Sequence, residues 1–457
     1  MHTDSRGLAL TAAGDDAVAR YNTTIDHLFE YRLDTGKCLK AALAADPEMP
    51  MAQCLRGYLF MMFNTNQVYD RVDDALTAAR ALSDRMNPRE ALHLAALEAW
   101  RSGDVAQAVL VWEQLLAEYP LDLLALRLQH NTVFWMGRSQ ALRGRIAQVL
   151  PAWDESVPGY GYVLGMFAFG LEECGEYASA EAQGRRAVEI HAEDLWAVHA
   201  VAHVLEMQGR LDDGMAWLDQ PADQWADRNP FRGHLWWHTA LFPFEKGDYE
   251  RVLALYDNAI RTEKTDFYLD IQNAAALLLR LEFQDVDVGA RWLELAEHAE
   301  AHSDDHVLAF TDLHHMISLV RAGKRAAAEA LLESLANFAA TPGNFTATTM
   351  EPATIPLCKT ILAYGDGNYD GAIEILRDLR YEDACVGGSH AQRDLFAQLL
   401  IECALKASRL PLARALLAER VALRPHSHGN WTKYAGVLAK LGDTAGAEAA
   451  EARASAV

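Results

Sequence analysis

Two pairs of histidines, each spaced four residues apart, are the side chains best suited to chemistry in this sequence. His199 and His203 lie in the segment HAVAH, and His234 and His238 lie in HLWWH. Because residues four apart share one face of a helix, each pair would direct two imidazoles the same way. Neutral imidazole is a common ligand of transition metals in proteins. The four histidines therefore predict a site for a divalent transition metal such as zinc, iron or manganese.

A later segment adds candidates for acid–base chemistry. His314 lies nine residues before a glycine, as His238 does, and His199 lies ten residues before one. If the site is catalytic, we expect His199, His238, His314 and Asp312 to carry protons. Neither pair matches His-Glu-x-x-His, which argues against a metallopeptidase. The alternative is that the histidines only pack and hydrogen-bond inside the protein.

The segment GGSHAQRD, residues 387–394, is unusually polar for the start of a packed helix. Ser389 is a good N-cap, and a glycine-rich helix start can bind an anion. Arg393 would add a forked donor for a carboxylate or phosphate. A capped helix with paired charges is the alternative. The residues predicted to contact a ligand are Trp237, Gln392, Arg393 and Asp394.

A recurring glycine indicates what positions these side chains. Glycines followed by a polar residue recur at intervals of 34 to 38, with small residues seven before and five after several of them. A glycine can end a helix in a left-handed cap, and small residues let two helices pack closely. The pattern is typical of tetratricopeptide-like hairpins, which must stack to bury their apolar faces. We therefore predict an all-α protein, an α-solenoid of about eleven or twelve divergent hairpins. The first five glycines are Gly103, Gly137, Gly175, Gly209 and Gly247.

The repeat pattern predicts one continuous array over residues 1–457. Two stretches interrupt it: residues 218–233, which contain two prolines and a tryptophan, and a Thr-, Pro- and Gly-rich stretch. Long loops of this kind are often functional. The predicted parts are a helical cap (1–64), a repeat body with histidine-rich first helices (65–338), a loop (339–356) and C-terminal repeats (357–457).

Composition limits the partners and the compartment. Against 41 basic residues stand 64 acidic ones, giving a formal net charge of −23, which argues against nucleic acid and anionic membranes as partners. No apolar run of about 18 residues predicts a transmembrane helix. Six scattered cysteines without a Cys-x-x-Cys pair, and an N-terminus without an apolar signal segment, favour a cytoplasmic protein. Dimerisation through the terminal hairpins is compatible with this pattern.

Four long motifs resemble the tetratricopeptide-repeat protein 38 family: DLWAVHAVAHVLEMQGR (194–210), HLWWHTALFPFEKGDYE (234–250), HSDDHVLAFTDLHH (302–315) and GGSHAQRDLF (387–396). The resemblance covers most of the chain and implies an α-solenoid of divergent repeats, without a settled activity. His390, His315 and Trp236 fall outside the family pattern. The residues that coincide with it are Trp196, His199, His203, Glu206, His234, Trp237, His238, His302, His306, Asp312, His314, Gln392, Arg393 and Asp394.

These observations favour a helical solenoid with a histidine-rich polar pocket on its concave face. We expect the pocket to bind a small polar or anionic ligand through a metal. One alternative is a metal- or histidine-dependent hydrolase or lyase that acts on a small molecule. The other is an interaction scaffold whose groove binds a peptide.

Overall fold

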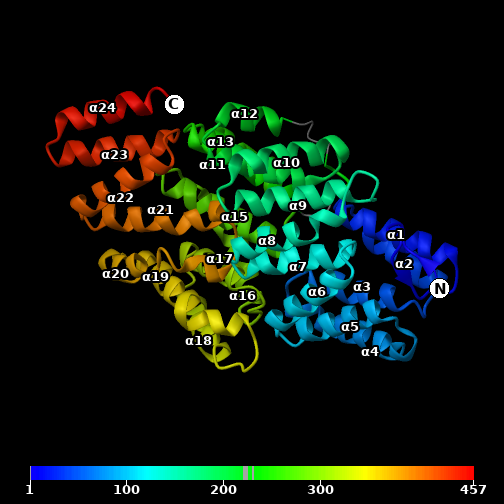
Figure 1. Cartoon of the computed structure of the whole chain (residues 1–457). Coiled ribbons are helices and arrows are strands. Elements are labelled where there is room, and N and C mark those ends of the chain that lie inside the picture. Colours follow the sequence, from blue (N-terminus) through cyan, green and yellow to red (C-terminus); the bar gives the residue numbers. More distant parts are fainter. Residues whose placement is uncertain (1, 220–224, 229–230) are drawn as a thin grey trace.

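Left-handed backbone turns divide the chain into helical hairpins. The computed structural model describes residues 2–219, 225–228 and 231–457, and these contain twenty-four α-helices, which pair in chain order into twelve hairpins (Figure 1). Each hairpin turn contains at least one residue with positive φ. Eight turns use a glycine, which adopts this conformation without steric cost. The other four use Tyr31, Asn64, Asp285 and Ser408. The predicted all-α solenoid of tetratricopeptide-like hairpins is therefore confirmed.

The first half of the array contains six hairpins and a short N-terminal ribbon. The ribbon pairs β1 (His2–Thr3) with β2 (Ala9–Leu10). The helices of the first half are α1 (Asp15–Phe29), α2 (Thr35–Ala45), α3 (Pro50–Met61), α4 (Tyr69–Arg80), α5 (Pro88–Arg101), α6 (Val105–Glu118), α7 (Leu123–Trp135), α8 (Ser139–Val149), α9 (Tyr160–Glu172), α10 (Tyr177–Ile190), α11 (Leu195–Met207) and α12 (Leu211–Trp217).

The second half contains the other six hairpins. Its helices are α13 (Phe231–Glu245), α14 (Tyr249–Leu255), α15 (Tyr268–Glu282), α16 (Trp292–Ala301), α17 (Ala309–Arg321), α18 (Arg325–Phe338), α19 (Ile355–Gly365), α20 (Tyr369–Leu379), α21 (His390–Lys406), α22 (Leu410–Leu423), α23 (His428–Lys440) and α24 (Thr444–Ala454). No helix in the described part of the chain is both long and apolar enough to cross a lipid bilayer.

Small residues allow the two helices of a hairpin to approach closely. Ala168 and Ala202, seven residues before their turn glycines, are fully buried. Small residues also allow close packing between hairpins: Gly214 of α12 faces the Phe242 ring of α13 so closely that a methyl group there would overlap it. The first helices α9, α11, α13, α15 and α17 pack one against the next, so their inner faces form a continuous row. The candidate histidines lie in this row.

The array curls until its C-terminal hairpins meet the middle of the chain. We call α21 to α24 the C-terminal hairpins, and Figure 1 shows them (orange to red) beside α11, α13 and α15. Arg280 of α15 donates to the Ala391 carbonyl of α21 at 2.9 Å, and His390 Nε2 lies 2.7 Å from Glu172 of α9. This closure brings residues about two hundred positions apart into one site.

Two predicted boundaries differ from the structure. The stretch 339–356, predicted as a loop, includes a 3-10 turn, η6 (Thr346–Thr349), and a π-helical turn, η7 (Met350–Thr354), that runs directly into α19. Thr349 and Thr354 hydrogen-bond neighbouring backbone carbonyls and stabilise these turns. The predicted cap, 1–64, ends inside the hairpin formed by α3 and α4. The predicted loop 218–233 lies partly outside the described residues.

The turn at Gly137 offers a test of the closure. Its φ is +66°, and a Cβ there would run into the Ala384 carbonyl. Gly323, with φ +71°, has open space around it. We expect Gly323→Ala to cost about 1–2 kcal/mol through backbone strain alone. Gly137→Ala should cost about 1–3 kcal/mol more because of the clash. Thermal unfolding of both variants measures the difference, and equal losses would contradict the close approach.

Candidate metal centre

The two predicted histidine pairs meet in the interior. His199 and His203 of α11 face His234 and His238 of α13, and all four are at most 4 % exposed. Ring centroids lie 4.4 Å apart for His199–His203 and for His203–His238, and 4.9 Å apart for His199–His234. One nitrogen from each ring lies within 4.8 Å of those of the other three. The shortest separation, 3.1 Å, joins His199 Nε2 and His234 Nε2. We call these four residues the histidine cluster.

The elements around the histidine cluster follow from local sequence. Asp194 caps α11 by accepting from the backbone N–H groups of Trp196 and Ala197. This cap fixes the start of the helix that carries one histidine pair. Aromatic rings then enclose the cluster: Phe169 lies 5.2 Å from the His199 ring, and Trp237 stacks on His234 at 5.4 Å with a 9° interplanar angle. Trp237, one of the residues predicted to contact a ligand, therefore packs directly against the histidine cluster.

Oxygen acceptors face the outer nitrogens of three rings. His234 Nδ1 donates to Asn273 Oδ1 at 2.8 Å, and His238 Nδ1 donates to Glu206 Oε2 at 3.2 Å. His203 Nδ1 lies 3.5 Å from Glu172 Oε2. In metal centres, a carboxylate or carbonyl on the outer nitrogen sets the tautomer and leaves the other nitrogen free for the ion.

Glu172 and Glu206 share a repeat position that a fuller comparison of the repeats finds. Each lies three residues before its turn glycine, Gly175 or Gly209. The family resemblance included Glu206 among the candidate residues, whereas no feature of the sequence considered above pointed to Glu172. Aligning the repeats on their glycines would have paired these two carboxylates.

Several imidazole nitrogens in the histidine cluster are buried without a hydrogen-bond partner. Within the described part of the chain these are His199 Nδ1, both nitrogens of His203, and His238 Nε2. An unsatisfied buried polar group typically costs about 1–3 kcal/mol. Their concentration in one place distinguishes the cluster from single packed histidines.

Burial keeps three rings of the histidine cluster, those of His199, His234 and His238, neutral. Desolvation, followed by the nearby imidazoles, holds the pKa of His199 and of His238 well below the ordinary value of 6.5. Desolvation also lowers the pKa of His234 to about 3, against the opposing effect of its hydrogen bond to Asn273 Oδ1. A neutral imidazole has a free lone pair, so these rings are in the form that binds metals.

The C-terminal hairpins supply cations to the two outer carboxylates. Burial alone would raise the pKa of Glu172, but His390 and His203 outweigh it and lower that pKa to about 2. Burial would lower the pKa of His390, yet Glu172 and Glu173 raise it to about 9. On Glu206, Arg424 Nη1 lies 3.5 Å from Oε1. His390, which the sequence analysis set aside, thus belongs to the outer layer of the site.

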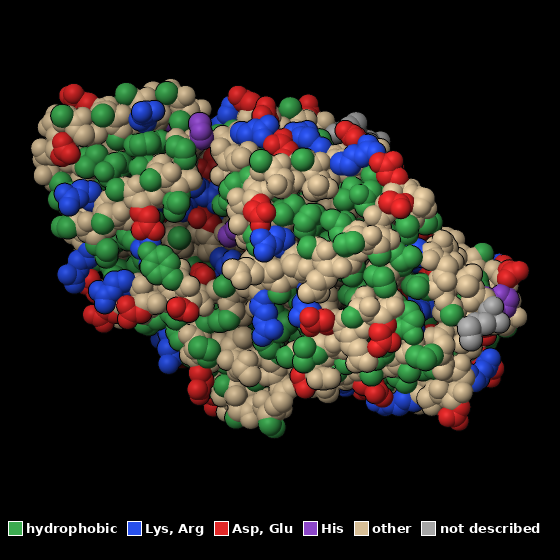
Figure 2. Space-filling model, in the orientation of Figure 1, with side chains coloured by type: hydrophobic (Ala, Val, Ile, Leu, Met, Phe, Trp, Pro, Cys, Tyr) green, Lys and Arg blue, Asp and Glu red, His purple; other side chains and the backbone are tan. Residues whose placement is uncertain are grey.

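A crevice separates the C-terminal hairpins from the rest of the molecule. Figure 2 shows it as a hollow with histidine, acidic and basic side chains visible in its depth. The His390 side chain is 26 % exposed, whereas Glu172 is fully buried. Glu172, Glu173, His203 and His390 form a second group of closely spaced donors. The imidazoles of the histidine cluster are therefore buried, whereas the charged groups at its edge, such as His390, are partly exposed to solvent.

The structure does not bring His314 and Asp312 to the histidine cluster. His314 Nδ1 donates to the Phe310 carbonyl at 2.7 Å, and burial lowers the pKa of His314 to about 4. Among the described residues, none of the ring contacts that link the cluster includes His314. Asp312 instead accepts from His306 Nδ1 at 3.0 Å. His199, His238 and His314 lie at nearly equal separations from their turn glycines, but this shared position did not predict which of them are close in space.

The other predicted ligand-contacting residues have partners within the protein. Gln392 completes a capping box with Ser389 at the start of α21. Arg393 donates to the Gly388 carbonyl and lies 3.7 Å from Asp383. Asp394 accepts two bonds from Arg420, at 2.7 and 2.8 Å. The alternative of a capped helix with paired charges, also weighed for this segment, accounts for these contacts.

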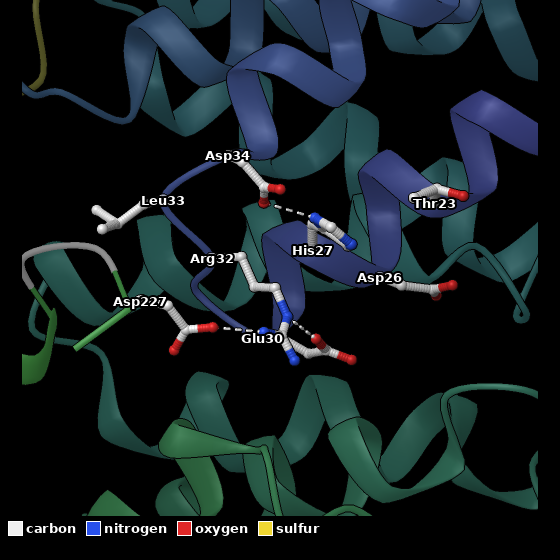
Figure 3. A pocket seen from close by; sticks show the side chains of 8 residues that line it. All are labelled: Thr23, Asp26, His27, Glu30, Arg32, Leu33, Asp34 and Asp227. Atoms are coloured by element: carbon white, nitrogen blue, oxygen red, sulfur yellow. Dashed lines mark hydrogen bonds and ion pairs between the residues drawn. The ribbon is translucent and has the colours of Figure 1, made fainter. Parts of the chain in front are cut away.

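An open cavity of about 510 Å³ lies beside the N-terminal hairpin. Figure 3 shows that Arg32 pairs there with Glu30 and Asp227, and that His27 points to Asp34. Cys38 Sγ and Asp34 both contact His27 through Nδ1, at 3.5 and 2.7 Å. A nucleophile–base–acid chain needs different ring nitrogens for its two partners. This arrangement is therefore not a cysteine–histidine–aspartate triad.

Comparisons with known proteins agree only on helical repeats. No known family model matches the chain. The human IFIT1 dimer with m7Gppp-AAAA is similar with a TM-score of 0.40 and 14% identity, over 97% of this chain and 90% of that chain. The TPR domain of P58(IPK) gives a TM-score of 0.24 at 13% identity, over 80% and 92%. Yeast Tom70 gives 0.33 at 13% identity, over 89% and 91%. Such low scores carry no inference about ligands, so the expected absence of a nucleic-acid partner stays a prediction.

The pKa of His314 predicts part of the acid sensitivity of folding. Its folded value of about 4 lies below the ordinary 6.5, so the unfolded chain binds more protons between these pH values. Stability is therefore lost as pH falls below 6.5, by about 2 kcal/mol from this residue between pH 7 and pH 5. His314→Gln should flatten the fall of the melting temperature over that range. His2→Gln, near the chain end, is the control and should keep the wild-type slope.

Proposed function

We propose that this protein binds one divalent transition metal ion through His199, His203, His234 and His238, and that it is a metal-binding helical-repeat protein. The observation that carries the proposal is the meeting of four buried imidazoles, with donor nitrogens within 4.8 Å of one another. Imidazole ligands suit zinc, copper, iron and nickel. Membership in the tetratricopeptide-repeat protein 38 family is part of the same proposal and rests on the shared motifs.

The geometry of the histidine cluster fits a four-coordinate ion after a small contraction. Bonds of 2.0–2.1 Å in a tetrahedral shell put ligand nitrogens about 3.3 Å apart. The His199–His234 pair, at 3.1 Å, is already near that value. Donors now up to 4.8 Å apart would have to close by about 1.5 Å. Small rotations of the four imidazoles on their helices supply such a change without moving the backbone.

Charge in the outer layer also supports a dication. Four neutral ligands leave a bound ion with its full positive charge in a buried place, which is costly without counter-charge. Glu172 and Glu206 provide two carboxylates directly behind His203 and His238. Each carboxylate is in turn held by a cation from the C-terminal hairpins, His390 or Arg424. A carboxylate paired with a cation therefore lies behind two of the four proposed ligands, His203 and His238.

Metal binding is better supported than either alternative. Four protein ligands complete the shell of a tetrahedral ion, whereas catalytic zinc sites keep one position for water. Among the residues that would hold the ion there is no carboxylate that could act as a general base. A peptide-binding groove is less favoured, because the C-terminal hairpins pack against the inner row at Ala391 and Glu172.

Elemental analysis of protein purified without a histidine tag tests the proposal. We expect about one equivalent of a divalent transition metal per chain in the wild type. The double variant His199→Ala/His238→Ala should lose that metal, because each of its two substitutions removes one ligand. The control is His298→Ala/His302→Ala, which removes another contacting histidine pair, with centroids 4.0 Å apart on α16 and just after it. It should keep the metal.

A variant that fails to fold would leave the elemental result ambiguous, so the wild type provides a second readout. Stripped wild-type protein loaded with Co²⁺ should show the intense visible absorption of tetrahedral cobalt. A wild type that neither retains metal nor gives this spectrum would refute the proposal.

The outer carboxylate on His238 should tune the affinity. Glu206→Gln keeps a hydrogen-bond acceptor but removes the charge behind the ring, so we expect metal affinity to fall about 10- to 100-fold. Glu245→Gln, a nearby change at the end of α13, is the matched control, because Glu245 hydrogen-bonds none of the four histidines. Competition with a chelator of known affinity measures both. Equal affinities of the two variants would remove Glu206 from the site.

A further inference from the structure

A second cavity, of about 370 Å³, lies inside the curve of the solenoid and away from the histidine cluster. Pockets of this size hold small organic molecules. Residues from several hairpins line the cavity, from the end of α3 to the stretch that follows α20. Six of the lining side chains are aromatic and half-buried: Tyr69, Trp100, Trp135, Tyr268, Phe338 and Phe345.

Charge in the lining is of one sign. Asp304 and Asp305 belong to it, and no lysine or arginine does. Two guanidiniums lie over rings of the lining: that of Arg101 over Tyr69 at 4.1 Å, paired with Asp73 at 2.8 Å, and that of Arg138 over Phe345 at 6.0 Å. Aromatic faces and carboxylates both attract cations, and cation–π contacts strengthen in a partly desolvated site. The lining thus favours a positively charged organic ligand.

One polar group in the wall lacks a partner. Thr132 is 4 % exposed, and its Oγ1 is buried without a hydrogen bond in the part of the chain that the structure describes. Thr132 also lines the cavity. Buried hydroxyls normally find an acceptor or donor, so an unpaired one at a cavity wall marks a place where a ligand can bond.

The acidic wall is held in a strained backbone conformation. Among the residues that the structure describes, five non-glycine residues have positive φ, and four of them close hairpin turns. His306, with φ 45°, is the exception, because it lies between α16 and α17 beside Asp305. Its ring is fixed by Asp312 at 3.0 Å and by Ser334 at 2.8 Å. Strain of this kind, held by surrounding contacts, gathers at ligand sites. Asp312 therefore acts here as a positioning residue.

We propose that this cavity binds a small organic cation, an ammonium attached to an aromatic or apolar body, with the charge at Asp305 and the body between the aromatic walls. Asp305 Oδ1 already accepts from the Asn66 backbone N–H at 2.6 Å, and the carboxylate also accepts from the Thr65 side chain. These two bonds orient the carboxylate at the cavity wall. This site is independent of the metal centre, since none of the four histidines lines it.

Calorimetry with phenyltrimethylammonium and its uncharged isostere, tert-butylbenzene, tests the charge. We expect the cation to bind once per chain, at least about tenfold more tightly than the isostere. Asp305→Asn should weaken cation binding about tenfold while leaving the isostere unchanged. Asp378→Asn, at a side chain that is 79% exposed on α20, is the control and should bind like the wild type.

A second variant tests the aromatic wall. Phe345→Leu keeps an apolar side chain but removes a ring, so cation affinity should fall several-fold, with quenching of tryptophan fluorescence as an independent readout from Trp100 and Trp135. Equal affinity for cation and isostere would overturn the proposal in favour of a merely apolar cavity. Absence of binding at 10 mM phenyltrimethylammonium would overturn it as well.

Discussion

The interior between α11 and α13 depends on one interaction: the four imidazoles of the histidine cluster are buried against one another. A neutral imidazole has one donor and one acceptor, and both need partners when water is excluded. In the histidine cluster the outer nitrogens of His234 and His238 are satisfied by Asn273 and Glu206, while several inner nitrogens are not. An apolar residue at any of these positions would avoid the cost. The metal ion that we propose would give these nitrogens the partner that they lack among the described residues.

Closure of the solenoid brings cations from the C-terminal hairpins to the carboxylates behind the histidine cluster. A buried carboxylate behind a ring is itself unfavourable unless it is paired. The C-terminal hairpins provide those pairs, because His390 meets Glu172 and Arg424 meets Glu206. The tight approach of Gly137 to Ala384 belongs to the same closure. Long-range curvature and local electrostatics are thus coupled: a looser superhelix would leave both carboxylates unpaired.

Much of this arrangement could be predicted from sequence, and the limit has a physical cause. Helical spacing and adjacency of hairpins were enough to bring His203 and His238 together. The same reasoning failed for His314, because α17 lies two first helices beyond α13. At 8–10 Å per packed helix, that puts it about 16–20 Å away. His390 was missed for the opposite reason: it is remote in sequence, and only the curvature of the whole array, which no local pattern encodes, brings it to Glu172.

In each hairpin, different positions fix the fold and line the interior, which explains how one array could contain the two sites that we propose. Left-handed turns and small residues such as Ala202 fix the pairing of helices, and they occupy only a few positions per repeat. The inner faces of the first helices are then free to vary. In α11 and α13 they carry imidazoles, whereas in α7 and α15 they carry Trp135 and Tyr268 toward the aromatic cavity. Divergence of the repeats away from their turns is what lets the concave side acquire chemistry without loss of the fold.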